Sequence, residues 1–339
     1  MAFDKFTPAE FTRVATRVIK PYVTTVFAVF CFSAAGSLFV MLGDVPPIAK
    51  TAWRIMMTAL LISPMFCYKL CTQDGREEFQ KLLSKTALCT LFIVCASSAA
   101  NLFVWVYAMN YTSLCNSMLF LSTMPFMCML HMLIKGQKPS SMESMGAIVA
   151  FAGVAVVAFG SHFGGKDGLF GDFLALLAGV FGYVWLHYDN YFMQELKVNI
   201  FVYYFPFAVV SASMCVILSC LTEGMTFVGL MTGFVETDPV LVFFLGLGPG
   251  VLGLVLMTYC QSHVNILAVS IIQTLEPLFG SLVATLLSVQ NDITLWTLCG
   301  GTVMILGNCL AIYGHEKARV AKSKAENEEF LLAHCNAAQ

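Results

Sequence analysis

Charged residues are scarce in this sequence, and their scarcity restricts the class of protein. Only 11% of the 339 residues are charged and 58% are hydrophobic, whereas roughly 25% of the residues in soluble domains are charged. A helix that crosses the hydrocarbon core of a bilayer needs about 20 apolar residues, and most of the chain consists of such runs. We exclude a water-soluble fold and expect an all-α integral membrane protein in a lipid bilayer, with no sizeable domain outside it.

Motifs of pumps and membrane enzymes are also missing. The sequence contains no GxxxxGK[ST] phosphate-binding loop, no HExxH and no GxSxG, which argues against a primary pump, a metalloprotease or a serine hydrolase. The 13 cysteines form no CxxC pair and lie mostly in apolar runs, where they serve as packing. We expect no enzymatic activity, no cofactor, no metal and no nucleic acid partner.

The apolar runs, bounded by charges, Pro or Gly, predict ten membrane-spanning helices. Their ranges are 21–43, 48–68, 87–109, 113–134, 142–160, 170–192, 198–220, 240–260, 266–288 and 294–313. With the N-terminus in the cytoplasm, fifteen of the 18 Lys and Arg residues fall on the cytoplasmic side, only Lys50 and Lys166 fall opposite, and Arg54 lies within a span. This bias predicts that both termini are cytoplasmic. It leaves open which membrane holds the protein.

Both ends of the chain are less apolar than the spans. Residues 1–20 have a helical spacing of apolar side chains opposite Arg13, Arg17 and Lys20, which favours an amphipathic helix on the membrane surface over an ordinary tail. Residues 314–339 are expected to form a cytoplasmic tail.

The two halves of the chain resemble each other. At an offset of about 152 residues, Leu119–Pro125 aligns with Ile271–Pro277, so each half has a proline in its fourth span. Glycines recur every seven residues in each fifth span: Gly146, Gly153 and Gly160, then Gly300, Gly307 and Gly314. A five-helix repeat crosses the membrane an odd number of times, so residues 21–160 and 170–313 are expected to form two inverted repeats, as in many secondary transporters. The glycines let helices approach closely, within one chain or between the chains of a homodimer.

Several short motifs occur in an order and spacing similar to those of a known family. They are Pro46-Pro47 before Trp53-Arg54, Ala108–Ser113 before Pro125, Gly136–Ser140 before Gly146, and Leu275-Glu276-Pro277. Over residues 21–315 the sequence resembles the drug/metabolite transporter superfamily, in its ten-helix branch with two EamA-type repeats. The resemblance implies a cavity lined by the first four helices of each half, and substrates that range from amino acids and nucleobases to nucleotide sugars. The segment Ser288–Asp292 departs from the Gly-Glu pair of many members, so no subgroup is assigned.

Charged residues inside spans are costly and mark candidate sites. Glu276, in the middle of the ninth span, can bind a proton that couples transport or a cationic group, or it can form a fixed structural pair. Gln273 lies one turn earlier on the same face. Arg54, about two turns inside the second span, can bind a carboxylate or phosphate in bidentate fashion, lie at the interface, or pair with Glu276.

Uncharged candidates complete the predicted substrate or coupling site. Asn101 and Trp105 share one face of the third span, and Asn116 lies at the entry of the fourth. Pro125 and Pro277 are the candidate hinges. His187 and Asp189, near the end of the sixth span, are attributed to an interfacial belt in preference to a polar gate.

Together these features predict a secondary transporter that moves a small polar metabolite by alternating access, either coupled to protons or by exchange. The alternative is a multi-pass membrane enzyme or a structural membrane protein without transport activity.

Overall fold

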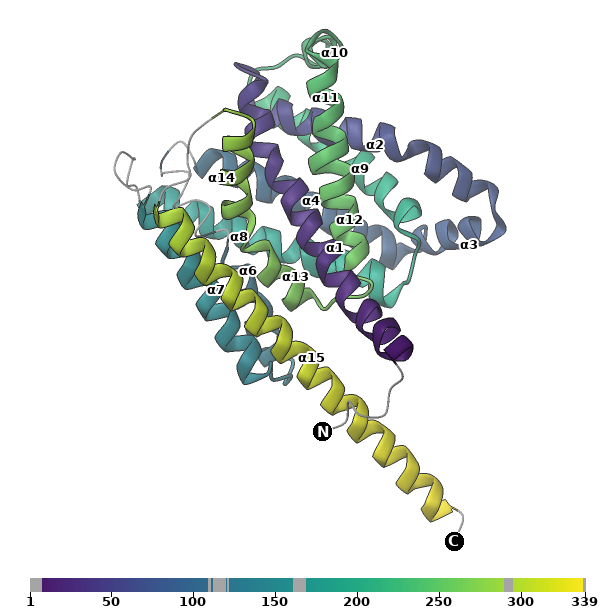
Figure 1. Cartoon of the computed structure of the whole chain (residues 1–339). Coiled ribbons are helices and arrows are strands. Elements are labelled where there is room, and N and C mark those ends of the chain that lie inside the picture. The colour runs from purple at the N-terminus through teal and green to yellow at the C-terminus, as the bar shows by residue number, and fades with distance from the viewer. Residues whose placement is uncertain are drawn as a thin grey trace.

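The fold is made of helices. The computed structural model describes the backbone of residues 8–108, 111, 120, 122–160, 169–289 and 295–337. Helices make up 86% of the structure, and the described residues contain no strand. Figure 1 shows a bundle of inclined helices, with α7 and α15 side by side along one flank and α15 extending beyond the others. The all-α class expected from the sequence is confirmed.

Most predicted spans overlap one helix each, with bounds that differ in places, and two are composite. The single helices are α1 (Pro8–Met41), α2 (Pro47–Cys71), α4 (Lys85–Ala108), α6 (Met124–Ile134), α7 (Ser141–Gly160), α8 (Leu169–Asn190), α9 (Ile200–Thr222) and α15 (Leu295–Ala337). The π-helix η1 (Tyr191–Glu195) continues α8. The composite spans are α11 (Pro239–Leu245), η2 (Gly246–Val255) and α12 (Leu256–Cys260), then α13 (Ile266–Gln273) and α14 (Glu276–Leu286).

Seven helices of the described residues are long and apolar enough to cross a membrane, or eight if the bent pair α13 and α14 counts as one broken span. The predicted spans at 113–134 and 142–160 are represented by the shorter apolar segments Met124–Ile134 and Ser141–Val156. Helix α1 runs without interruption from the expected surface segment into the first span.

Two further helices have no counterpart among the predicted spans. Helix α3 (Gln73–Leu82) is short and rich in charge, and the side chain of Thr72 caps it by accepting a hydrogen bond from the Gly75 N–H at 3.2 Å. Helix α10 (Phe227–Glu236) is apolar but has only 10 residues, too few to span a bilayer.

The glycines of the two fifth spans bring α7 and α15 together. A Cβ atom added to Gly146 would lie 2.5 Å from the backbone nitrogen of Ala311, and one added to Gly153 would lie 2.6 Å from Met304 Cγ. The order of these contacts makes the two helices antiparallel. The interpretation that glycine permits close helix packing is confirmed, and the packing occurs within one chain.

We predict that Gly307→Ala destabilises the fold by about 1 to 3 kcal/mol, because its Cβ atom would lie 2.3 Å from the backbone nitrogen of Ala150. Gly248→Ala is the matched control, since nothing lies within 4 Å of a Cβ atom there. Thermal unfolding in detergent should show a lower midpoint for the first variant only. Equal midpoints would contradict the close packing of α7 and α15.

Candidate functional site

A vestibule of about 850 Å³ opens at one end of the bundle. It lies where the start of α1, the end of α8, the segment before α13 and the middle of α15 meet. Charged and polar side chains form most of its wall. The lining residues are Pro21, Tyr22, Met132, Gln137, Lys138, Glu143, Asn190, Gln194, Ser262, His263, Asn265, Ile266, His315, Ala318 and Arg319. The vestibule is large enough for a small-molecule ligand.

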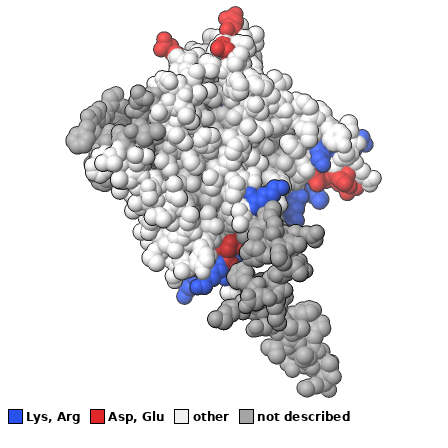
Figure 2. Space-filling model, viewed as in Figure 1, with Lys and Arg blue, Asp and Glu red and all other residues white. Residues whose placement is uncertain are grey.

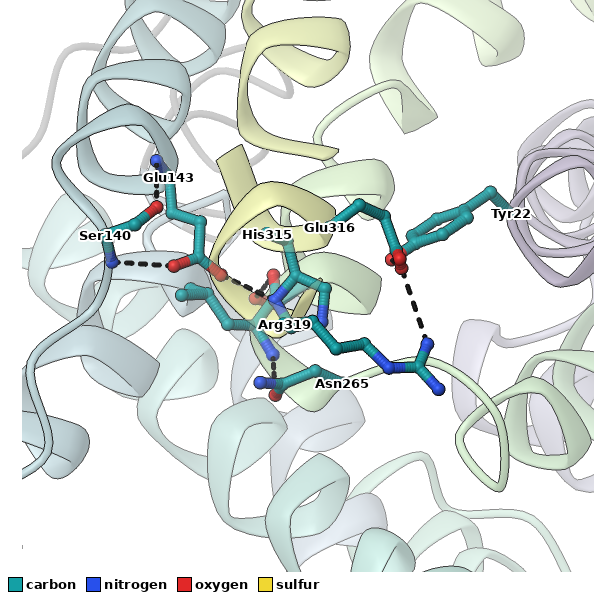
Figure 3. A network of polar contacts seen from close by, with 9 residues as sticks. Tyr22, Ser140, Glu143, Asn265, His315, Glu316 and Arg319 are labelled. Carbon is teal, nitrogen blue, oxygen red and sulfur yellow. Dashed lines mark hydrogen bonds and ion pairs between the residues drawn. The ribbon is translucent and has the colours of Figure 1, made fainter. Parts of the chain in front are cut away.

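One wall of the vestibule is fixed by a polar contact between α7 and α15, seen in Figure 3. The Glu143 carboxylate lies 2.7 Å from His315 Nδ1, and it accepts a hydrogen bond from the Ser140 N–H at 2.7 Å. Ser140 Oγ accepts in return from the Glu143 N–H at 3.2 Å. This reciprocal capping box begins α7 and orients the carboxylate toward α15.

A second contact joins α15 to α1 at the same wall. The Tyr22 hydroxyl donates to the Glu316 carboxylate at 2.6 Å, and Arg319 lies 3.5 Å from that carboxylate (Figure 3). Because Arg319 is largely exposed, this ion pair contributes little stability. The two contacts hold helices from both halves of the chain around the vestibule.

Two short helices lead from the vestibule to a smaller cavity. Helix α13 begins at the vestibule with Ile266 and ends with Gln273 at the small cavity, and α6 reaches from Met132 in the first to Met124 in the second. The small cavity has a volume of about 10 Å³, room for about one water molecule. Its lining residues are Ser122, Met124, Ser270, Gln273, Thr274, Glu276 and Pro277.

The small cavity lies at a break in the helical chain. Helices α13 and α14 meet at an angle of 42° across Thr274 and Leu275. Pro277 falls in the first turn of α14, where its missing N–H has no cost. Pro125 holds the same position in α6. The two prolines therefore begin new helices, and their role as hinges stays a prediction.

Gln273 and Glu276 both line this cavity, as their spacing in the sequence suggested. Gln273 is 8% exposed, and its side-chain oxygen has no hydrogen-bond partner. Glu276 is partly exposed, and no hydrogen bond or ion pair of its carboxylate occurs within the described part of the chain. Both groups are available to a ligand, a proton or water.

Arg54 is not among the residues that line the small cavity. It is 7% exposed, and its guanidinium carbon lies 5.6 Å from the centre of the Phe32 ring and 5.8 Å from that of Phe39. These distances fit cation–π contacts. The guanidinium is therefore buried within the bundle, and the described residues contain no ion pair between Arg54 and Glu276.

The remaining candidates lie elsewhere. Asn101 of α4 donates to the Ala178 carbonyl of α8 at 2.7 Å, so its amide joins two helices. The Trp105 indole N–H is buried without a partner. Neither residue lines the vestibule or the small cavity. Asn116 lies outside the described residues.

Asp189, attributed from the sequence to an interfacial belt, is a buried carboxylate. Asp189 is 1% exposed and accepts hydrogen bonds from the hydroxyls of Tyr203 and Thr258, the latter at 2.7 Å. The prediction of an interfacial belt is therefore wrong for Asp189. Its neighbour His187 packs on His131 with ring centres 4.5 Å apart. The charge of Asp189 inside a predicted span was the available signal, but its position near the end of that span suggested exposure.

The end of the molecule opposite the vestibule is packed. Trp53 is 1% exposed and donates its indole N–H to the Leu230 carbonyl at 3.0 Å. The Glu223 carboxylate accepts from the backbone N–H groups of Ile48 and Ala49 at 2.7 and 3.0 Å, so α9 caps the start of α2. Lys50 Nζ donates to two carbonyls at the end of α1. Apolar side chains of α1, α2, α10 and α11 fill the space between them.

These features describe a helical membrane protein with one open end, one packed end and a broken helix between them. Residues 19–159 match the EamA-like transporter family. This match confirms the resemblance seen in the sequence. The match covers less than half of the chain, and together with the apolar helices it supports a multi-pass membrane protein. No curated protein matches the chain in sequence.

The fold continues beyond the EamA-like segment. A solved crystal structure of a protein aligns with 86% of this chain and 96% of its own, with a TM-score of 0.67 and 15% identity. At this identity the likeness concerns the fold alone. Its coverage includes much of the second half of the chain.

We predict that Tyr203→Phe lowers stability by about 1 to 3 kcal/mol, because the buried Asp189 carboxylate loses one of its two donors. Tyr204→Phe is the control, since Tyr204 is equally buried and its hydroxyl has no hydrogen-bond partner among the described residues. Thermal unfolding should separate the two variants. Equal losses would show that the Asp189 contact contributes nothing specific.

Proposed function

We propose that this protein is a secondary transporter that moves a small polar metabolite by alternating access. The observation that carries the proposal is the asymmetry of the bundle: one end opens into the vestibule and the other is packed around Trp53. Between them lies the helix break at Thr274 and Leu275, beside Glu276. In transporters, broken helices near the midplane commonly form the substrate site.

The architecture that fits this function is ten spans arranged as two inverted five-helix repeats, residues 21–160 and 170–313. Two observations support it. The last helices of the two halves, α7 and α15, pack against each other in antiparallel fashion. The segments Ser122–Pro125 and Thr274–Pro277, equivalent in the repeat, meet at the same small cavity. Because the two halves are inverted relative to each other, an exchange of their conformations would convert a state open at one end of the bundle into a state open at the other end.

The vestibule is proposed to face the cytoplasm, with both termini on that side. Lys138 and Arg319 line it, in accord with the concentration of Lys and Arg on cytoplasmic segments. On the face shown in Figure 2, the end that carries α10 has acidic side chains only, whereas Lys and Arg lie toward the other end. A homodimer would use surfaces other than the glycine faces of α7 and α15, which are occupied within the chain.

Movement of the solute can be driven by protons or by exchange. The two mechanisms differ in whether the Glu276 carboxylate must gain and lose a proton. A carboxylate that lines the cavity without a fixed partner can exchange a proton in each transport cycle. In a pure exchanger, a substrate molecule carried in the opposite direction returns the protein to its starting conformation. The carboxylate then need not change its protonation state.

We predict saturable uptake of one solute class by sealed vesicles that contain the purified protein. The panel consists of amino acids, nucleobases and nucleotide sugars, each tested with and without a pH gradient. If protons couple, Glu276→Gln should abolish the dependence on the gradient and leave exchange intact, while Glu236→Gln, at the end of α10, should behave as wild type.

If uptake by the Glu276→Gln variant still depended on the pH gradient, Glu276 would not be the residue that couples protons to transport. Failure of folded protein to move or exchange any class of the panel would overturn the transport proposal and favour a membrane enzyme or a structural role.

A further inference from the structure

The inner face of α10 is fixed to the packed end of the bundle through Trp53 of α2. In Figure 1, α10 is seen nearly end-on above α11, so it lies across the bundle. The Leu230 carbonyl accepts the Trp53 indole N–H at 3.0 Å, and the Phe234 ring meets the indole edge to face with ring centres 6.4 Å apart. A Cβ atom added to Gly233 would lie 2.9 Å from Trp53 Cζ2. These contacts make α10 a cover over Trp53.

The outer surface of α10 divides into an apolar side and a polar edge. Phe227, Val228 and Val235 are 61%, 68% and 75% exposed. Val228 and Val235 are about two turns apart and therefore lie on the same side of the helix. Thr232 and Glu236 are one turn apart and form an exposed polar edge beside them. Such a division is typical of a helix that lies in the plane of a membrane interface.

Short connections hold α10 at the membrane surface. It follows α9 after four residues and precedes α11 by two, and both neighbours belong to helices that can span a membrane. From Glu236 to Pro239 the chain reaches about 10 Å at most, little more than the roughly 5 to 8 Å of a headgroup layer. Leu221 of α9 and Val240 of α11 are 76% and 58% exposed on these spans. The apolar side of α10 therefore continues the lipid-facing surface of both neighbours.

We propose that α10 is an interfacial helix whose partner is the bilayer surface, and that it serves as the lid of the packed end. Phe227, Val228 and Val235 enter the boundary between headgroups and acyl chains, while the polar edge faces water. The helix contains no Lys or Arg, so its insertion depends on apolar contact and not on attraction to anionic lipids. A zwitterionic bilayer therefore suffices.

The two faces of α10 couple the lipid surface to the closure of the bundle. Before the packed end can open, Trp53 must separate from Leu230 and Gly233, so α10 must move along the membrane surface. Gly224 forms the bend between α9 and α10 with a φ of 67°, a conformation that glycine adopts at little cost. Glu223, just before this bend, holds the first turn of α2 independently of α10. The lid role rests on the proposed function, whereas the contact with lipid does not.

The first experiment measures the depth of α10 in phosphatidylcholine vesicles that contain the full-length protein. Spin labels are attached to a keto amino acid introduced at Val228, Val235 or Thr232, so that the native cysteines stay unlabelled. Collisions with oxygen and with a water-soluble nickel complex report the depth of each label. Labels at Val228 and Val235 should lie about 5 to 10 Å inside the bilayer surface. The label at Thr232 is the matched control and should remain in contact with water.

The second experiment measures the distance between labels at Asp44 and Glu236, attached in the same way, by pulsed electron resonance. Val228→Asp weakens insertion and should enlarge the population with the longer distance. Thr232→Asp adds the same charge on the polar edge and should leave the distribution unchanged.

A second variant keeps the lid role testable if Val228→Asp does not fold. Trp53→Phe removes the hydrogen bond to Leu230 and retains a ring. It should enlarge the population with the longer distance about fivefold, the effect of one neutral hydrogen bond. The label at Val228 should keep its depth in this variant.

The outcomes separate the lipid contact, the lid and transport. Labels at Val228 and Val235 that are as accessible to water as the one at Thr232 would overturn insertion, and so would labels shielded from both reagents by a second copy of the chain. An unchanged distance distribution in both Val228→Asp and Trp53→Phe would overturn the lid role. The expected depths without uptake of any solute would support the lipid contact and overturn transport alone.

Discussion

A helix that is interrupted inside a bilayer leaves backbone N–H and C=O groups without intrahelical partners, and lipid cannot supply any. Such a break is tolerated only where protein or a water-filled cavity surrounds it. In this protein the break at Thr274 and Leu275 and the segment before Met124 both border the same small cavity. At the break between α13 and α14, the Thr274 and Leu275 N–H groups donate to the Ile271 and Ile272 carbonyls at 3.0 Å each, and both residues are buried. The breaks therefore bring polar side chains such as Glu276 to a cavity inside the bundle.

The same constraint explains what the sequence could predict. Long apolar runs in a membrane form helices, so the all-α class was evident from composition and the predicted spans overlap the observed apolar helices, although several of their bounds differ. The glycine spacing indicated close packing, although not which partner would lie opposite. Helices α3 and α10 were missed because a helix shorter than a span has no comparable signal. The composite nature of the span at 240–260 was not visible either, whereas Pro277 marked the span at 266–288 as interrupted.

The candidate site could be predicted only in part. Gln273 and Glu276 share a cavity because they flank the break between α13 and α14, only three residues apart in the sequence. The surroundings of Arg54 depend on α1, and the burial of Asp189 depends on hydroxyls from α9 and α12. Contacts of this kind join residues far apart in the chain, and no local pattern encodes them. Asn101 shows the converse: a polar residue with the spacing of a site proved to join α4 to α8.

Alternating access requires that the two ends of the bundle open in turn, and distances measured in membranes test this directly. Spin labels introduced at Lys138 and His263 report on the vestibule, and labels at Asp44 and Glu236 report on the packed end. Pulsed electron resonance with and without a transported solute should show two populations for each pair. The account predicts that the vestibule distance shortens as the distance at the packed end lengthens. A single unchanged distance for both pairs under all conditions would contradict it.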